Sequence, residues 1–260
     1  MLSYQHGFHA GNKADVLKHA VQHAVLETLS QADNSWLYVE THAARGQYDL
    51  TGKQAEKTGE AKTGILALPQ AANAPPALRK WLKYVQAAGP KAYPGSPRIA
   101  VDHLNASDRL VLFEKHPAEH AALAQNLGTA RNIQILKEDG YRGALRLQPR
   151  RGENMLLMLD PSYETEADME ALAHWVPRAL RKWRGAKILI WLPLFADGRE
   201  EEFGAFLADL DEGFVAGSRW QRGGDDPSAL EGSAMIGLRL GGASARKAFA
   251  IAAELDKIWS

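Results

Sequence analysis

The fold is decided by the stretch Met155-Leu156-Leu157-Met158-Leu159-Asp160-Pro161-Ser162-Tyr163-Glu164. Its first five residues are apolar and too few for a typical helix, which predicts a strand buried on both faces. Asp160 follows this strand, and Pro161 ends it because proline has no N–H for a ladder hydrogen bond. In open α/β sheets, ligands bind outside the carboxyl ends of the strands. The stretch therefore places a carboxylate, a rigid turn and an aromatic ring at a predicted binding site.

Composition limits the classes of protein to consider. The chain has 260 residues, 45% of them hydrophobic, and no apolar run approaches the roughly 20 residues that span a bilayer. It has no cysteine, which excludes disulfides, thiolate metal sites and cysteine nucleophiles. Basic and acidic residues number 31 each, so the net charge gives no global argument for nucleic-acid binding. The N-terminus lacks the pattern of a signal peptide, and we expect a cytoplasmic monomer without a membrane partner.

Helices and strands alternate along most of the chain. A helix capped by Asn12 and running to about Ser30 is predicted to bury an apolar stripe, with Lys18, His19 and His23 beside that stripe. Besides the central strand, the pattern predicts strands at 36–40, 109–114, 132–136 and 187–192, with an antiparallel pair near 214–220 and 234–240. Further helices are predicted at 117–127, 166–183, 200–210 and 244–259.

This alternation predicts one α/β domain over residues 1–260, built on a mostly parallel seven-stranded sheet. Residues 1–30 are expected to form an N-terminal cap, and residues 49–97, which break the rhythm, a small helical insertion at the rim. Seven strands with a terminal hairpin resemble the Rossmann-like fold of class I S-adenosylmethionine-dependent methyltransferases. Asp160-Pro161-Ser162-Tyr163 is similar to the Asp-Pro-Pro-Tyr motif of methyltransferases that modify amino groups of DNA and RNA.

Polar residues also end the other predicted strands. Glu40 precedes the small-residue turn Thr41–Tyr48, which suits close approach of the backbone to a nucleotide-like cofactor. Glu114 ends the next strand, where an acidic residue is well placed to bind ribose hydroxyls. The histidines His6, His9, His19 and His23 suggest a metal site, but no carboxylate or cysteine stands at a familiar ligand spacing, so we expect no metal.

Several motifs occur in an order that is specific to one family. They are Met1-Leu2-Ser3-Tyr4, His6, Phe8-His9-Ala10-Gly11-Asn12, Ala14-Asp15-Val16-Leu17-Lys18-His19, Thr41-His42-Ala43, Tyr93-Pro94-Gly95-Ser96-Pro97, Glu114 with His116-Pro117, Asp139-Gly140, and Asp160-Pro161 with Tyr163. The chain thereby resembles the RlmJ family, whose members methylate adenine N6 in 23S ribosomal RNA with S-adenosylmethionine. The resemblance is strongest over residues 1–163.

The resemblance implies a role for each matching residue. The residues expected to contact S-adenosylmethionine are His19, His42, Ser96, Glu114, Asp139, Gly140 and Asp160. Asp160, Pro161 and Tyr163 would be catalytic, with the Asp160 carboxylate and the Pro161 carbonyl accepting the adenine N–H groups while Tyr163 stacks on the base. The residues expected to close over the substrate are Tyr4, His6, Lys18 and Tyr163. The implied partner is 23S ribosomal RNA, as naked or partly assembled RNA.

The chain departs from the family pattern at two places. The first strand of the family ends in Asp-Thr-His-Ala-Gly-Ala-Gly, whereas this chain has Ala44 and Arg45 at the first glycine and the next small position. Arg45 would either crowd the cofactor or point outward. The second departure is Ser162 in place of a proline. Two alternatives stay open at this point: a DNA-directed protein, which would methylate adenine or serve the use of external DNA, and a catalytically weakened nucleic-acid-binding relative.

Overall fold

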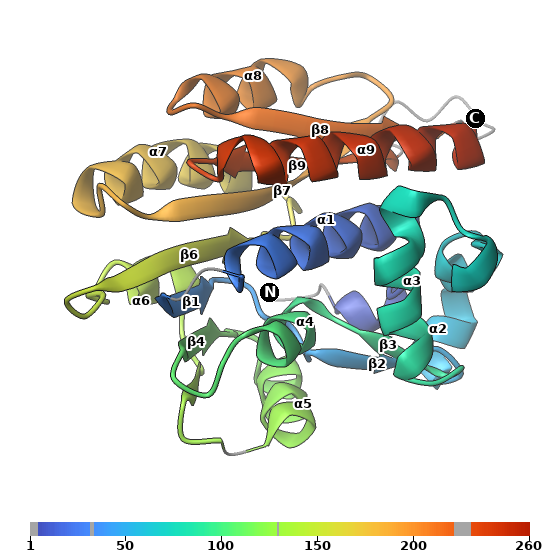
Figure 1. Cartoon of the computed structure of the whole chain (residues 1–260), viewed down its shortest axis with the longest axis horizontal. Helices are drawn as coiled ribbons and strands as arrows, with labels where there is room; N and C mark the ends of the chain where they lie inside the picture. Colours follow the sequence, from blue (N-terminus) through green and yellow to red (C-terminus); the bar gives the residue numbers. More distant parts are fainter. Residues whose placement is uncertain (1–4, 32–33, 129, 221–229) are drawn as a thin grey trace.

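The computed structural model describes residues 5–31, 34–128, 130–220 and 230–260. Seven strands form one sheet in the order β5-β4-β1-β6-β7-β9-β8 (Figure 1). They are β1 (Ser35–Glu40), β4 (Arg109–Phe113), β5 (Ile133–Leu136), β6 (Glu153–Leu159), β7 (Lys187–Phe195), β8 (Phe214–Arg219) and β9 (Leu230–Leu238). The first five are parallel, while β9 runs antiparallel to both β7 and β8. The predicted mostly parallel α/β sheet is confirmed.

Strand β6 lies in the middle of the sheet, between β1 and β7. All five residues from Met155 to Leu159 are buried, as predicted for a strand covered on both faces. Leu156 and Met158 belong to one hydrophobic core, whereas Met155, Leu157 and Leu159 belong to the other. The strand ends at Leu159, so Asp160 is the first residue beyond the ladder.

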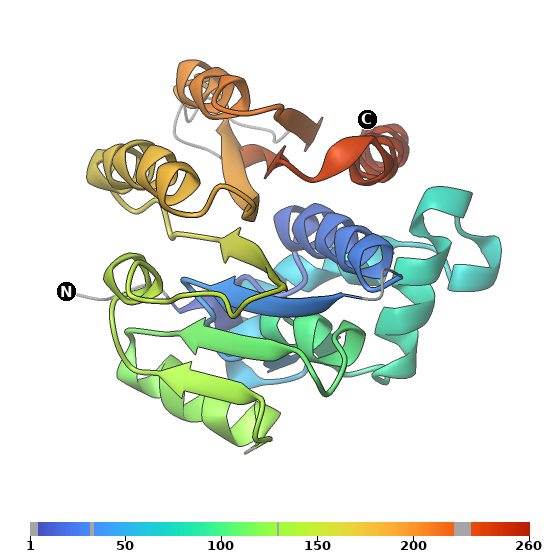
Figure 2. The ribbon, with the colours of Figure 1, turned by 60° about the vertical axis from the view of Figure 1, so that its left-hand side comes forward.

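Helices cover both faces of the sheet (Figure 2). One face carries α1 (Lys13–Leu29), α3 (Pro76–Ala87), α4 (Ser96–His103), α5 (Pro117–Leu127) and α9 (Gly241–Trp259). The other carries α6 (Gly140–Ala144), α7 (Glu166–Lys182) and α8 (Glu201–Asp209). Within the described ranges, no helix has the length and apolar character needed to cross a membrane.

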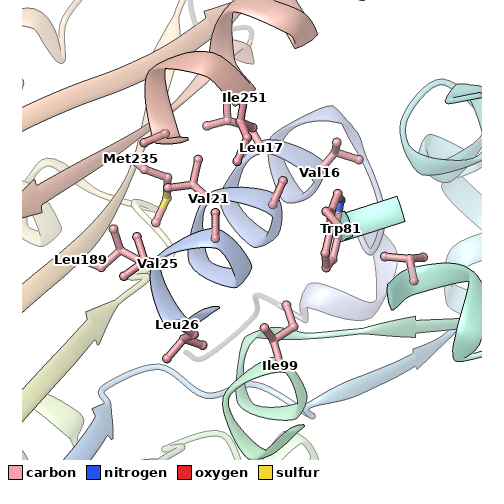
Figure 3. Packing of buried hydrophobic residues seen from close by; sticks show 14 of the residues in the cluster. Val16, Leu17, Val21, Val25, Leu26, Trp81, Ile99, Leu189, Met235 and Ile251 are labelled. Atoms are coloured by element: carbon pink, nitrogen blue, oxygen red, sulfur yellow. The ribbon is translucent and has the colours of Figure 1, made fainter. Parts of the chain in front are cut away.

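Helix α1 is buried nearly all the way round. Asn12 caps it by accepting a hydrogen bond from the Asp15 backbone N–H, as predicted. Its apolar residues pack between the sheet, α9, α3 and α4 (Figure 3). The prediction that Lys18, His19 and His23 lie beside the buried stripe is wrong, because these side chains are buried too. A helix with neighbours on several sides has no solvated face to receive them.

The segment between β1 and α4, which includes α3, lies at the rim of the sheet. It begins and ends in a two-stranded antiparallel ladder of β2 (Gln47–Asp49) and β3 (Ala92–Pro94). Between these strands lie α2 (Lys53–Thr58), α3 and three short 3-10 turns, which are Glu60–Lys62, Ile65–Ala67 and Ala71–Asn73. Helix α2 ends at Gly59, which has the left-handed conformation favoured at a helix C-terminus. Before α1, the chain forms the 3-10 turn η1 (His6–Phe8).

Candidate active site

The predicted site residues converge on one edge of the sheet. Because β1, β4, β5 and β6 are parallel, the residues that follow them meet at their common carboxyl edge. Hydrogen bonds from Thr41 N to Met158 O (3.2 Å) and from Ala43 N to Phe113 O (2.9 Å) tie the β1 turn to β6 and β4. Gly140 packs so closely on this turn that a Cβ there would lie 2.0 Å from Thr41 O. Only glycine fits at this position.

Glu114 is fixed by backbone donors at the end of β4. Its Oε2 accepts a hydrogen bond from Ala44 N (2.8 Å), and its Oε1 accepts one from His116 N (2.6 Å). Burial raises the pKa of this carboxyl, and the two backbone N–H groups oppose the rise. A carboxylate oxygen has more than one lone pair, so each oxygen retains the capacity to accept a ribose hydroxyl.

Ala44 and Arg45, where the chain departs from the family pattern, have separate structural consequences. Ala44 has φ 47°, in the left-handed region that favours glycine. The Arg45 guanidinium forms an ion pair with buried Glu119 on α5, with Nε 2.8 Å from Oε2, and lies 5.9 Å from the centre of the Tyr48 ring. The Arg45 side chain is therefore held against α5 by Glu119, a partner that neither of the two expected orientations included.

The side chains of His42 and Asp139 lie near the Tyr141 hydroxyl group, which has no hydrogen-bond partner among the described residues. Tyr141 OH is buried, and the Tyr141 ring meets that of His42 edge-on at 5.0 Å. Burial lowers the pKa of His42, opposed by the charges of Asp160 and Asp139. Asp139 caps α6 by accepting from Arg142 N (3.0 Å). An orphaned polar atom among these predicted cofactor residues fits the binding of a polar ligand.

Asp160 belongs to a buried cluster of ions. Its Oδ2 accepts a hydrogen bond from Lys18 Nζ at 2.6 Å, and the same ammonium lies 2.9 Å from Asp15 Oδ1. His6 Nε2 lies 2.9 Å from both oxygens of Asp15. Burial alone would raise the pKa of Asp15, but His6 and Lys18 hold it well below its usual range. These contacts connect η1 and α1 to the carboxyl end of β6.

Tyr163 is held in a strained conformation beside this cluster. Its φ is 51°, which is rare for an aromatic residue and costs of order 1–3 kcal/mol. Tyr163 OH donates to Trp191 O (2.6 Å), and the two rings meet edge-on at 5.5 Å. Lys18 Nζ also lies 5.5 Å from the centre of the Trp191 ring. Strain of this kind is characteristic of sites where a side chain is held in place for function.

Two predicted cofactor residues take part in a buried hydrogen-bond network. His19 Nδ1 lies 2.9 Å from Tyr93 OH, and burial lowers the pKa of His19 to about 3. Ser96 Oγ donates to Glu40 Oε1, while Tyr38 OH donates to Glu40 Oε2 at 2.9 Å. Burial raises the pKa of Glu40 to about 8, so this carboxyl is mostly protonated at neutral pH. A cofactor role for His19 and Ser96 stays a prediction.

Tyr4 lies outside the described residues, and its predicted substrate contact stays a prediction. Across the ranges that the structure describes, no three histidine or acidic side chains are arranged to hold a metal ion. His9 instead pairs with Glu60 (2.9 Å), and the His23 ring lies 4.5 Å from that of His103.

Sequence reasoning missed three residues that contact the predicted site residues. Asp15 lies three residues before Lys18 in the first turn of a helix, so an i,i+3 ion pair was the available signal. Trp191 follows a buried run in β7 and is one strand away from Asp160. Tyr141 follows Asp139-Gly140 directly. No sequence pattern distinguishes such rings from ordinary core residues.

Comparison with known proteins identifies the family. The family model described as "Ribosomal RNA large subunit methyltransferase D, RlmJ" matches residues 33–236. The ribosomal RNA large subunit methyltransferase J of Escherichia coli K12 is 35% identical over 198 residues, which are 75% of this chain and 71% of that protein. The enzyme of the same name from Haemophilus influenzae is 33% identical over 199 residues, again 75% and 71% of the two chains.

A solved structure supports the fold independently. Protein LPL1258 of Legionella pneumophila, assigned to the family model DUF519, superposes with a TM-score of 0.87 at 24% identity, covering 96% of this chain and 94% of that one. The predicted class of enzyme, a ribosomal RNA methyltransferase that depends on S-adenosylmethionine, is confirmed at the level of the family. The chain belongs to the RlmJ family of ribosomal RNA large subunit methyltransferases.

Proposed function

We propose that this protein methylates the exocyclic N6 of an adenine in 23S ribosomal RNA. The observation that carries the proposal is the Asp160 carboxylate, which Lys18 holds at the carboxyl end of β6 within Asp160-Pro161-Ser162-Tyr163. Both curated relatives are named as ribosomal RNA large subunit methyltransferases, which supports an RNA substrate. The motif supports an amine as the acceptor group.

The residues at the carboxyl edge fit S-adenosylmethionine. Glu114 would bind the ribose hydroxyls, and Asp139 and Gly140 would lie against the adenine of the cofactor, beside the unsatisfied Tyr141 hydroxyl. His42, on the β1 turn, and the buried side chains His19 and Ser96 would complete the site. When bound, S-adenosylmethionine supplies an electrophilic methyl group on a sulfonium centre.

The chain's own residues would orient and activate the acceptor amine. The lone pair of adenine N6 is delocalised into the ring, which makes this nitrogen a poor nucleophile. If Asp160 Oδ1 and the Pro161 carbonyl each accept one N–H, the nitrogen becomes pyramidal and its lone pair can be aimed at the methyl carbon. Lys18 would keep Asp160 in place through Oδ2. Positioning and fixed charges of this kind supply most of the acceleration in such a site.

Tyr163 and the N-terminal turn would hold the substrate base. Stacking on an aromatic ring is worth about 1–3 kcal/mol per base and tolerates any base. The hydrogen bond from Tyr163 OH to Trp191 O fixes this ring before substrate arrives. His6 in η1, together with Lys18 and the preceding Tyr4, would close over the base. Formation of the N–CH3 bond breaks the S–CH3 bond and leaves a neutral thioether as the product of the cofactor. The methylated nitrogen is then cationic and acidic, so it can lose its proton to water and no separate base is required.

We propose a cytoplasmic monomer that acts on naked or partly assembled RNA. A chain of zero net charge should not bind RNA tightly without regard to sequence, because such binding depends on many phosphate contacts. A loop or single-stranded adenine, reached at a small unstacking cost, is the expected target. Analytical ultracentrifugation would test the monomer.

The decisive experiment compares substrates and one pair of variants. Protein and radiolabelled S-adenosylmethionine are incubated with naked 23S RNA from a strain lacking the enzyme, with ribosomes and with duplex DNA. We expect label in N6-methyladenine from naked RNA and little in DNA. Asp160→Ala should lower the rate at saturating cofactor by about 100-fold or more, whereas the exposed Asp209 changed to Ala should not. Label mainly in DNA, or in another base, would refute the proposal.

A further inference from the structure

Asp15 lies at the centre of the buried ion cluster, yet no step of the proposed reaction uses it. The side chain is 1% exposed. Its Oδ1 lies 2.9 Å from Lys18 Nζ, and its Oδ2 accepts a hydrogen bond from Gly11 N at 2.9 Å. His6 lies 2.9 Å from both oxygens. A buried carboxylate is costly unless it is paired, so its presence on a helix that is buried nearly all the way round requires a reason.

The reason lies in the charge of Lys18. Its ammonium lies 2.6 Å from Asp160 Oδ2, the carboxylate that would face the acceptor amine. Methyl transfer moves a positive charge from a sulfonium centre to the amine nitrogen, so both the cofactor and the transition state are cationic. An uncompensated ammonium at Lys18 would repel that charge. Asp15 contacts the same ammonium and neutralises its positive charge. The negative charge of Asp160 can then still attract the cationic methyl donor and acceptor.

We infer that Asp15 is a positioning residue that acts as the counter-ion of Lys18, so that Lys18 can hold Asp160 without opposing the cationic methyl donor and acceptor. The inference rests on the proposed function and extends it to a residue of the N-terminal helix. Burial supports it, since Lys18 and Asp15 are both shielded from the solvent that would otherwise screen their charges. The lowered pKa of Asp15 supports its ionised form.

The test compares two ligands that differ in charge at one atom. S-adenosylmethionine carries the sulfonium charge, whereas S-adenosylhomocysteine has a neutral thioether in its place. Calorimetry at pH 8.5, where imidazoles are ordinarily neutral, gives both dissociation constants. Asp15→Asn should weaken S-adenosylmethionine about tenfold more than S-adenosylhomocysteine, the size expected for one added charge several ångströms away. Lys18→Met leaves Asp15 without the ammonium and should shift the ratio the other way.

A matched control separates charge from folding. Asp108 is also 1% exposed and accepts hydrogen bonds from Trp36 N (2.8 Å) and Asn105 N (2.7 Å), but it precedes β4 at the opposite edge of the sheet. Asp108→Asn should leave the ratio of the two affinities unchanged. If Asp15→Asn weakens both ligands equally, or if Lys18→Met shifts the ratio in the same direction as Asp15→Asn, the inference is refuted. If Asp15→Asn fails to fold, the direction in which Lys18→Met changes the ratio of the two dissociation constants decides the question.

Activity provides a second readout. With naked 23S RNA, Asp15→Asn should lower kcat about tenfold to a hundredfold with little change in KM. Adding Lys18→Met should return the ratio of the two ligand affinities towards the wild-type value, while kcat stays low because Asp160 has lost the ammonium that holds it. A purely structural role predicts no return of the ratio in the double variant. Wild-type protein that binds S-adenosylmethionine but methylates no RNA would contradict the proposed function, and the affinity ratio would still test Asp15.

Discussion

Ala44 offers a direct test of the strain in the β1 turn. With φ 47°, it occupies a conformation that costs an L-residue roughly 1–2 kcal/mol and costs glycine nothing. Glycine, in turn, loses about 0.5–1 kcal/mol more backbone entropy on folding. Ala44→Gly should therefore raise the free energy of unfolding by about 0.5–1 kcal/mol. The hydrogen bond from the backbone N–H of residue 44 to Glu114 is available in both proteins.

Urea denaturation measures the change, and thermal unfolding should show a midpoint about 1–4 °C higher in a chain of this size. The neighbouring Ala43 is the control, because it is fully buried and does not have a positive φ. Ala43→Gly should lower the free energy of unfolding by about 1 kcal/mol through lost burial and added chain entropy. If Ala44→Gly is no more stable than wild type while Ala43→Gly behaves as expected, the argument from backbone strain is wrong.

Three further predictions follow from the geometry of the site. Glu114→Ala should weaken S-adenosylmethionine about 10- to 100-fold in calorimetry, since a charge-assisted ribose contact is worth about 1.5–3 kcal/mol; an unchanged affinity would remove Glu114 from the cofactor site. Arg45→Gly should leave the affinity for the cofactor within about twofold but lower the free energy of unfolding by roughly 1–3 kcal/mol, because buried Glu119 loses its partner; tighter cofactor binding would instead revive the crowding alternative. Glu40 should make stability depend on pH: its folded pKa of about 8 exceeds the ordinary 4.5, so its contribution is full below pH 4.5 and is lost as the pH rises towards 8. Glu40→Gln should flatten that part of a denaturation profile measured against pH, and an identical slope in the two proteins would contradict the assignment.

Strands β1, β4 and β6 could be predicted from the sequence because each is a short apolar run ended by an acidic residue. The short strands β2 and β3 lie where no strand was expected. The run from Met155 to Leu159 and the polar Asp160 after it placed the end of β6 correctly. The helix 117–127 was predicted with the bounds that the structure shows for α5. Pro117 at the first helical position and Gly128 after the last are typical of helix ends, so both bounds could be predicted. A loop was expected over residues 221–232 between the last two strands. Residues 230–232 instead belong to β9, and residues 221–229 lie outside the described part of the chain.

What the sequence could not predict depends on contacts between distant parts of the chain. Lys18 was expected beside the buried stripe of its helix rather than within the core, because no local pattern shows that α9 and β9 also cover α1. The pairing of Lys18 with Asp160 joins residues 142 positions apart. Arg45 had two possible directions until Glu119, 74 positions later, was placed beside it. The periodicity of apolar residues predicts which side of a helix or strand is buried, but it does not predict which charged side chains form ion pairs.

The position of α1 also has a consequence for biosynthesis. This helix precedes every strand of the sheet, yet it packs against α9, the last helix of the chain, and against β9 (Figure 1). During translation the part of its apolar surface that faces β9 and α9 therefore stays uncovered until residues 230–259 have left the ribosome. Lys18 lies on this helix, so its pairing with Asp160 also depends on how firmly α1 is held against the sheet. A chain truncated before α9 should leave one side of α1 exposed and hold Lys18 less firmly against Asp160, so incomplete polypeptides are expected to be less active.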